Sequence, residues 1–302
     1  MSSDVLVRTV DPAAGLRIIA AVTTDLAREA ARRHEAVGLT ACALARGLTA
    51  SALLATLTKG GERVTVQIQC EGPLGGITID AAIDTDRVGL LRGYLVHARA
   101  VTMPCVGRGR VVEVLGRDGV VNVIRDIGLT ERYQGQVPLL TGEVDEDIEN
   151  YLRASEQVPS ALGCDVWMPD GVTIAASAGV LVQALPGADS DSVRPSQHTL
   201  RTGAVYEYLR TGGTSARELA EAAYGAPLEF LGEQPLEFRC RCSPDRVEEM
   251  LMLLTTVDLD EMIAEGRDAS VTCNFCNAHY AIDAAALERV RAALAHGPRG
   301  NN

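Results

Sequence analysis

The chain has 302 residues, and its 40 acidic side chains outnumber its 28 lysines and arginines, giving a formal net charge of −12. Apolar residues make up 47% and charged residues 23%, as in ordinary globular proteins, so disorder along the whole chain is excluded. The acidic balance argues against nucleic acids and anionic membranes as main partners, because both are bound through clustered cations. At roughly 100–200 residues per domain, the length predicts one large domain with a smaller module, or two modest domains.

The single lysine excludes one large class of ATPases. A Walker A loop needs its lysine within G-x-x-x-x-G-K-[ST], whereas Lys59 lies in TLTKGG. ATP hydrolysis of the P-loop type is therefore not expected.

Neither a targeting segment nor a membrane span is predicted. The first residues, MSSDVLVRTVD, lack the cationic start and apolar core of a signal peptide. The longest apolar stretch, 37–57, is interrupted by Arg46 and by polar residues, and a span needs about 18 uninterrupted apolar residues. We expect a soluble, cytoplasmic protein.

Helical and strand patterns are mixed along the first part of the chain, to about Ala184. For example, Val64, Val66 and Ile68 alternate with polar residues, the period-2 pattern of a strand with one buried face, and EGPLGG then predicts a hairpin turn. In chain order, the predicted elements are helices over 25–36 and 39–57, strands over 64–70, 76–84, 110–116 and 119–128, a helix over 143–157, and two strands within 165–185.

The residue composition of the chain changes at Pro186. The turn-rich segment PGADSDSVRPSQ is followed by helical patterns over 199–210 and 215–224, and Ser215 with Glu218 predicts a capping box. The apolar residues of these helices must pack on another part of the protein. We therefore predict an α+β (mixed α/β) N-terminal domain over 1–186, a helical linker over 187–235, and a small C-terminal four-cysteine zinc domain over 236–302.

Four of the eight cysteines form a constellation in the C-terminal domain. Cys240 and Cys242 form C-x-C, Cys273 and Cys276 form C-x-x-C, and residues 243–272 separate the pairs. Two close cysteine pairs around a folded spacer are typical of a tetrahedral Zn²⁺ site with Zn–S bonds of about 2.3 Å. An extended backbone would place residues i and i+2 on one face, so both sulfurs of C-x-C can bind one ion.

Other interpretations of these residues are open. The four cysteines could be structural and metal-free, and His279 could replace one thiolate, although a neighbouring or packing role fits it better. Cysteines in helix or strand patterns are expected to be small buried hydrophobes: Cys42, Cys70, Cys105 and Cys164. The remaining histidines are isolated and are interpreted as surface or core side chains: His34, His97, His198 and His296.

The cysteine spacing also permits a redox switch. Residues i and i+2 of a strand are roughly 6.6 Å apart at Cα, the upper edge for a disulfide, so oxidation of C-x-C needs local rearrangement. Metal binding contributes about 10–16 kcal/mol in zinc-finger peptides, more than the stability of many whole domains at about 5–15 kcal/mol. Oxidation with loss of metal should therefore unfold the small domain and free the linker beside it.

Three rival functions are disfavoured. Between Leu236 and Val290 there are 11 acidic residues and 5 arginines, a net charge of −6, which opposes nucleic-acid binding. A zinc deaminase needs H-x-E upstream of P-C-x-x-C, but Thr272 precedes Cys273. A thioredoxin-like enzyme places C-x-x-C where a strand meets a helix, whereas this pair lies between two short strand-like stretches.

The combined motifs resemble the redox-regulated 33 kDa chaperonin (heat-shock protein 33) family of bacteria. The resemblance rests on C-x-C, a spacer near thirty residues and C-x-x-C followed by HY, together with GGERVTVQIQCEGPLGGITIDA and GQVPLLTGEVDEDIENYLRASEQVPSAL. These stretches lie between residues 60 and 280 and so span most of the chain. Cys164 is not part of the family pattern.

The resemblance implies a chaperone of the holdase type, not an enzyme, which binds unfolded or oxidatively damaged polypeptides without ATP. It implies one Zn²⁺ per chain, bound in an inactive reduced form by Cys240, Cys242, Cys273 and Cys276. It further implies that oxidants release the zinc and form the disulfides Cys240–Cys242 and Cys273–Cys276, and that the monomer becomes an active homodimer. The alternative is a constitutive zinc-stabilised protein- or nucleic-acid-binding module without a redox switch.

Overall fold

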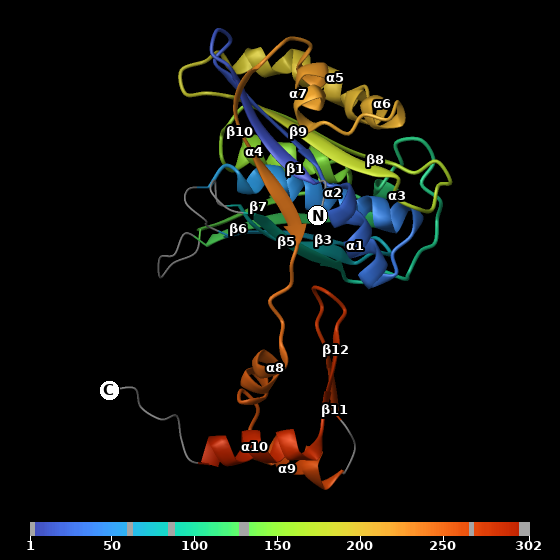
Figure 1. The fold of residues 1–302 in the computed structure, drawn as a ribbon, viewed down its shortest axis with the longest axis vertical. Coiled ribbons are helices and arrows are strands. Elements are labelled where there is room, and N and C mark those ends of the chain that lie inside the picture. Colours follow the sequence, from blue (N-terminus) through green and yellow to red (C-terminus); the bar gives the residue numbers. More distant parts are fainter. Residues whose placement is uncertain (1–3, 59–62, 84–87, 127–132, 266–268, 296–302) are drawn as a thin grey trace. The chain divides into compact units, whose positions relative to one another are not determined.

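A computed structural model describes residues 4–58, 63–83, 88–126, 133–265 and 269–295. The chain divides into two units, Met1–Arg239 and Cys240–Asn302 (Figure 1). Lys59 and His296, which entered the sequence predictions, lie outside the described residues.

A sheet of ten strands forms the framework of the first unit, in the order β7-β6-β3-β4-β5-β10-β1-β2-β9-β8. Its neighbouring strands pair antiparallel, except that β10 pairs with β5 in parallel. The strands are β1 (Val5–Asp11), β2 (Leu16–Val22), β3 (Arg63–Cys70), β4 (Gly76–Ala82), β5 (Gly89–Leu95), β6 (Gly119–Asp126), β7 (Tyr133–Pro138), β8 (Ser160–Trp167), β9 (Ala176–Ala184) and β10 (Glu229–Phe238).

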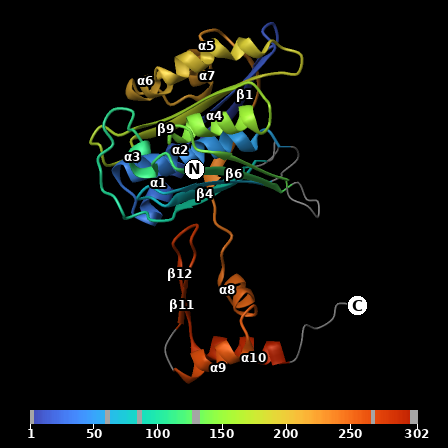
Figure 2. The ribbon, with the colours of Figure 1, turned by 180° about the vertical axis from the view of Figure 1, so that it is seen from behind.

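Three helices lie between the two halves of this sheet: α1 (Thr24–His34), α2 (Gly38–Ala55) and α4 (Val144–Ala154) (Figure 2). Helix α2 contacts β3, β4 and β5 on one side and β2, β8 and β9 on the other. The main hydrophobic core is therefore built around α2 and takes side chains from both halves of the sheet.

Helix α2 is apolar and long enough to cross a membrane, yet every one of its residues is buried within the first unit. Its sequence, GLTACALARGLTASALLA, is rich in small residues, which allow strands to approach the helix closely from both sides. The length and hydropathy of α2 are those of a core helix.

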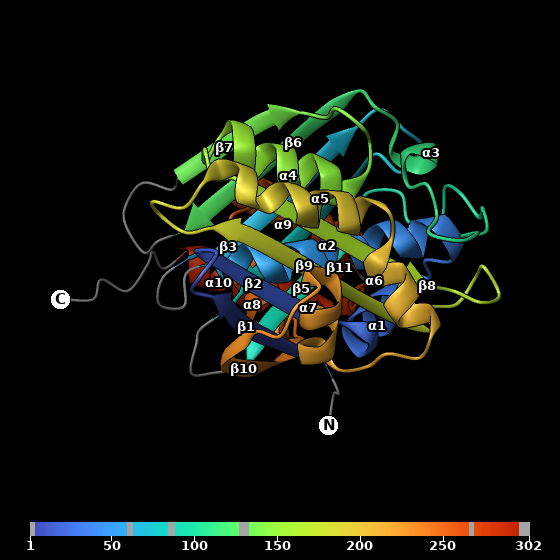
Figure 3. The ribbon, with the colours of Figure 1, turned by 90° about the horizontal axis from the view of Figure 1, so that it is seen from above.

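Three further helices cover the outer face of β1, β2, β8 and β9: α5 (Arg194–Arg201), α6 (Ala204–Arg210) and α7 (Ala216–Tyr224), with a 3₁₀ turn at Ser190–Val193 before them (Figure 3). We call α5, α6 and α7 the helical cover. Strand β2 shows why this face needs covering, because alternate residues point to opposite faces of a sheet. Ile19 and Ala21 join the core around α2, whereas Leu16, Ile18 and Ala20 join a second core under the cover.

The mixed α/β fold class is confirmed, and several predicted elements are found. The pattern over 64–70 and 76–84 forms the antiparallel pair β3–β4, although Asp84 is outside the described residues. The helices predicted over 25–36, 39–57 and 143–157 correspond to α1, α2 and α4. Ser215 caps α7 by accepting a hydrogen bond from the Glu218 amide at 3.2 Å.

The strand predicted over 110–116 is wrong. This segment contains the short helix α3 (Val112–Leu115), which ends at Gly116 with a positive φ of 74°. Val111, Val114 and Leu115 are fully buried, and this i, i+3, i+4 spacing belongs to one face of a helix. The apolar run VVEVL is too short to distinguish the helical period of 3.6 residues from the strand period of 2.

Five strands of the first unit were not predicted: β1, β2, β5, β7 and β10. Of these, β10 bears on the domain organisation, because the boundary predicted after Pro235 falls inside this strand. Pro235 pairs with Val5 of β1, and Leu236 pairs with Gly89 of β5. The division between the two units comes after Arg239.

The second unit contains α8 (Pro244–Leu251), α9 (Thr256–Ala264), the antiparallel pair β11 (Ala269–Thr272) and β12 (His279–Ile282), and α10 (Ala284–Ala295). Among its described residues, 240–265 and 269–295, seven buried side chains form a small core: Val247, Leu251, Leu259, Ile282, Ala286, Leu287 and Val290.

Candidate metal centre

The four cysteines of the second unit converge on one point. Their sulfur atoms all lie within 4.8 Å of one another. The Sγ atoms of Cys240 and Cys273 are 3.7 Å apart, and those of Cys242 and Cys276 are 3.3 Å apart. Four sulfurs at the corners of a tetrahedron with metal–sulfur bonds of about 2.3 Å would be about 3.8 Å apart. The donor set and its spacing therefore suit a tetrahedral metal ion.

Local structure holds each pair in position. Cys240 and Cys242 lie in the irregular segment just before α8, where Ser243 caps the helix by accepting a hydrogen bond from the Arg246 amide at 3.3 Å. Cys273 and Cys276 lie in the turn between β11 and β12. The Cys273 amide donates to the Ala278 carbonyl at 2.9 Å, which closes this turn. Both features follow the predicted geometry: a helix beginning at Ser243 and Pro244, and a tight turn around C-x-x-C.

A bound cation would change the protonation of the thiols at this point. Burial raises the pKa of Cys273 and of Cys276, so without a positive charge beside them these two thiols stay protonated at neutral pH. A divalent cation among the sulfurs would reverse this effect, because it binds the thiolate form and releases the protons.

The hydroxyl of Tyr280 adds a hydrogen bond to this cluster. It donates to Cys242 Sγ at 3.0 Å, and this bond raises the pKa of Tyr280 to about 12. Sequence reasoning missed this residue. His279 and Tyr280, the HY after C-x-x-C, were noted only as a motif. Strand β12 runs back beside the cysteines and brings Tyr280 to the sulfur of Cys242.

His279 stands apart from the four sulfurs. Its Nδ1 is 2.9 Å from Thr272 Oγ1 across the β11–β12 pair, and its side chain is exposed. The group of possible metal-binding side chains in the described part of the chain consists of the four cysteines.

Comparison with known proteins identifies the family of the chain that contains this site. The model of the family described as Hsp33 protein matches residues 4–283. The chain belongs to the Hsp33 family. A 33 kDa chaperonin of Geobacter sulfurreducens is 36% identical over 293 residues, which cover 97% of this chain and 96% of the relative. A 33 kDa chaperonin of Lacticaseibacillus casei is 37% identical over 281 residues, covering 91% and 94%.

A solved Hsp33 structure shares the fold. The crystal structure of the 33 kDa chaperonin of Thermotoga maritima matches with a TM-score of 0.84 at 24% identity, and the match covers 96% of this chain and 98% of that one. The resemblance inferred from the cysteine and SEQVPSAL motifs is thereby confirmed. Membership of the Hsp33 family makes this chain a chaperone.

The other cysteines of this Hsp33 chain lie in the first unit. Cys42, Cys105 and Cys164 are buried as expected, and Cys70 is half-buried. Burial raises the pKa of Cys70 and of Cys164, so both are poor nucleophiles at neutral pH.

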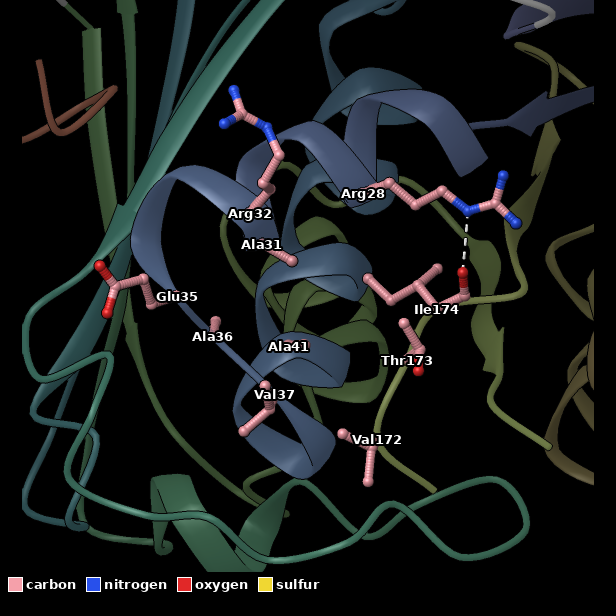
Figure 4. A pocket seen from close by; sticks show the side chains of 10 residues that line it. All are labelled: Arg28, Ala31, Arg32, Glu35, Ala36, Val37, Ala41, Val172, Thr173 and Ile174. Carbon is pink, nitrogen blue, oxygen red and sulfur yellow. Dashed lines mark hydrogen bonds between the residues drawn. The ribbon is translucent and has the colours of Figure 1, made fainter. Parts of the chain in front are cut away.

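The first unit of this Hsp33 chain also contains a cavity of about 410 Å³ (Figure 4). Arg28 lies at one side, with its Nε donating to the Ile174 carbonyl at 2.8 Å. The lining is mostly aliphatic and comes from α1, the start of α2 and the segment before β9: Arg28, Ala31, Arg32, Glu35, Ala36, Val37, Ala41, Val172, Thr173 and Ile174. It holds no cysteine or histidine.

Proposed function

We propose that this Hsp33-family chaperone is a redox-regulated, ATP-independent holdase, which binds unfolding polypeptides and prevents their aggregation under oxidative stress. In the reduced, inactive form, Cys240, Cys242, Cys273 and Cys276 hold one Zn²⁺. Oxidation of these thiols releases the ion and activates the protein. The observation that carries the proposal is the group of four cysteine sulfurs within 4.8 Å in the second unit.

The small core of the second unit supports a switch. Seven buried side chains form it, and most of them are aliphatic residues on short helices. A core of this size contributes little stability by itself, whereas a structural zinc contributes about 10–16 kcal/mol in zinc-finger peptides. Loss of the metal therefore removes most of what holds this unit in its folded state.

The oxidation step balances with a peroxide as the oxidant. The zinc-bound sulfurs are thiolates, so two thiolates form one disulfide as the O–O bond of one peroxide breaks, and the two peroxide oxygens take protons from solvent and leave as water. Two disulfides, Cys240–Cys242 and Cys273–Cys276, consume two peroxides. A disulfide has an S–S bond of about 2.05 Å, whereas the sulfurs of Cys240 and Cys273 are 3.7 Å apart and those of Cys242 and Cys276 are 3.3 Å apart, so the sulfurs of this cluster must move to form disulfides.

The remaining properties follow from this activity. The protein works in the cytoplasm, where thiols are kept reduced until oxidative stress. It is monomeric when reduced and dimeric when oxidised, and it catalyses no reaction. Its partners are exposed apolar segments of unfolding proteins rather than nucleic acids or membranes, in agreement with its net charge of −12.

The decisive experiment compares reduced and peroxide-treated protein in a light-scattering assay of a heat-denaturing client, with zinc release followed by a colorimetric chelator. We expect one zinc released per chain and suppression of aggregation only after oxidation. Cys276→Ser should lower the zinc content, whereas Cys70→Ser, at a half-buried thiol of the first unit, should leave it unchanged. Equal activity in both redox states would instead identify a constitutive chaperone with a structural metal.

A further inference from the structure

The helical cover hides an aliphatic surface of the sheet. Leu200 of α5 and Val205 and Leu209 of α6 are almost completely buried in the core beneath the cover. On the sheet side this core contains Ile18 of β2 and Val180 of β9. If the cover moved away, a continuous patch of aliphatic side chains would meet water, and such patches bind other apolar chains.

One arginine joins the cover to the sheet at the junction of α5 and α6. Arg108 lies in the irregular segment before α3 and makes two hydrogen bonds to the carboxylate of Asp165 on β8, with Nε at 2.9 Å and Nη2 at 3.2 Å. Its Nη1 donates to the carbonyl of Arg201, the last residue of α5, at 2.7 Å. Arg108 therefore binds the sheet and the end of α5 with one side chain.

The same carboxylate holds the start of α6. Asp165 Oδ2 accepts a hydrogen bond from the backbone amide of Tyr206 at 3.1 Å. This amide belongs to the first turn of α6 and has no acceptor within the helix, so it depends on the Asp165 carboxylate for its hydrogen bond. The negative charge of Asp165 also interacts favourably with the positive end of the dipole of α6. The end of α5 and the beginning of α6 thus depend on the Arg108–Asp165 pair.

Asp165 of this pair also contacts a residue of the main core. Asp165 is fully buried, and Arg46 of α2 lies 3.3 Å from its Oδ1. Arg46 is itself held by Glu143 at 2.8 Å and by the carbonyls of Arg108 and Gly109. Arg46 therefore keeps the Asp165 charge compensated from the core side, while Arg108 compensates it from the cover side.

We propose that Arg108 and Asp165 form a polar latch that holds α5 and α6 on the sheet and sets how readily the aliphatic surface beneath them becomes available to clients. This proposal rests on the proposed function and adds a second control point to it, in the first unit and distant in sequence from the four cysteines. Loss of Arg108 removes the hydrogen bonds that it donates to the Asp165 carboxylate and to the carbonyl of Arg201 at the end of α5. Arg46, which also pairs with Glu143 and Asp145, stays beside the buried carboxylate and compensates part of its charge, so the effect should be greatest in the cover.

The test uses the full chain, reduced and zinc-loaded, as the wild type, Arg108→Met and Arg210→Met. Arg210 is the matched control because it lies on α6 but pairs with Glu207 of the same helix. Hydrogen exchange followed by mass spectrometry should show α5 and α6 exchanging about tenfold faster or more in Arg108→Met, with α2 unchanged. The same variant should bind more of an apolar fluorescent dye and suppress client aggregation without oxidant, while its zinc content stays that of the control.

The outcomes separate the latch from the proposed function. Exchange in α5 and α6 equal to that of Arg210→Met would overturn the latch. Faster exchange without any gain in activity, in a protein whose oxidised wild type is active, would overturn the link between latch and client access. An inactive oxidised wild type would reject the proposed function, and the exchange rates would then decide the latch alone.

Arg108→Lys provides a second variant in case Arg108→Met does not fold. Lysine keeps the charge but cannot make the paired hydrogen bonds of a guanidinium. We expect an exchange rate in α5 and α6 between those of the wild type and Arg108→Met. A rate equal to that of the wild type would show that charge alone holds the cover, contrary to the geometry proposed.

Discussion

Tyr280 is a single residue that couples the β11–β12 pair to the first cysteine pair. Its hydroxyl donates to Cys242 Sγ at 3.0 Å. A hydrogen bond to a thiolate is charge-assisted and is stronger than one to a neutral thiol, so this bond favours the metal-binding form of Cys242. Partners of this kind orient metal ligands and tune their affinity.

Replacing Tyr280 by phenylalanine should therefore weaken zinc binding. We expect the affinity of Tyr280→Phe to fall by about 10–100-fold, the usual effect of removing a hydrogen bond to a ligand. Competition with a chromophoric chelator under reducing conditions measures this change. Tyr133→Phe, at an exposed tyrosine of β7, is the control. An unchanged affinity in Tyr280→Phe would show that its hydroxyl has no part in metal binding.

Helix α2 is the element on which the first unit is built, and Gly47 on this helix is less tightly packed than Gly179 on the neighbouring strand β9. A Cβ at Gly47 would meet Ile77 Cγ2 at 3.4 Å and Ile79 Cγ1 at 3.5 Å, which are ordinary van der Waals distances. On the neighbouring strand β9, a Cβ at Gly179 would lie 2.7 Å from both Cys164 Sγ and Thr49 Cγ2. The first position has room for a methyl group and the second does not.

Two alanine substitutions should accordingly have opposite effects on stability. Gly47→Ala should stabilise the first unit by about 0.5–1 kcal/mol, because it removes a flexible residue from the middle of a helix. Gly179→Ala should destabilise it by about 1–3 kcal/mol through overpacking. Urea unfolding followed by fluorescence measures both, since Trp167 of β8 is the single tryptophan and reports on this unit. A destabilised Gly47→Ala would contradict the packing described around α2.

At the scale of the whole molecule, the chain combines two units with different sources of stability. The first has two extensive aliphatic cores around one ten-stranded sheet, whereas the described part of the second has a small apolar core and the four-cysteine cluster. Units with separate cores can unfold separately when the stability of one depends on a ligand.

Removing the metal from reduced protein should unfold the second unit while the main core around α2 stays folded. After chelation, amide hydrogens of α8, α9 and α10 should lose their protection from exchange, whereas those of α2 and β3 should keep theirs. Returning zinc under reducing conditions should restore the protection. Simultaneous loss of protection in both units would show that they unfold as one cooperative structure.

The sequence by itself determined the elements and the site that depend on neighbouring residues. Alternation over 64–70 predicted β3, because buried apolar residues on one face of this strand alternate with partly exposed polar residues on the other. The spacing of Cys240, Cys242, Cys273 and Cys276 predicted one cluster, since each pair is positioned by a few adjacent residues and α8 begins at Ser243. The family resemblance followed from the same local motifs.

Only the tertiary structure decided features that depend on residues distant in the chain. Strand β2, LRIIAAV, is buried on both faces and shows no alternation, and β10 contains Pro235, so neither was visible as a strand in the sequence. The pairing of β10 with β1 and with β5 joins the two ends of the first unit. Arg46, Arg108 and Asp165 meet for the same reason: folding brings their charges together, and no local pattern marks a buried ion cluster whose members come from a helix, a loop and a strand.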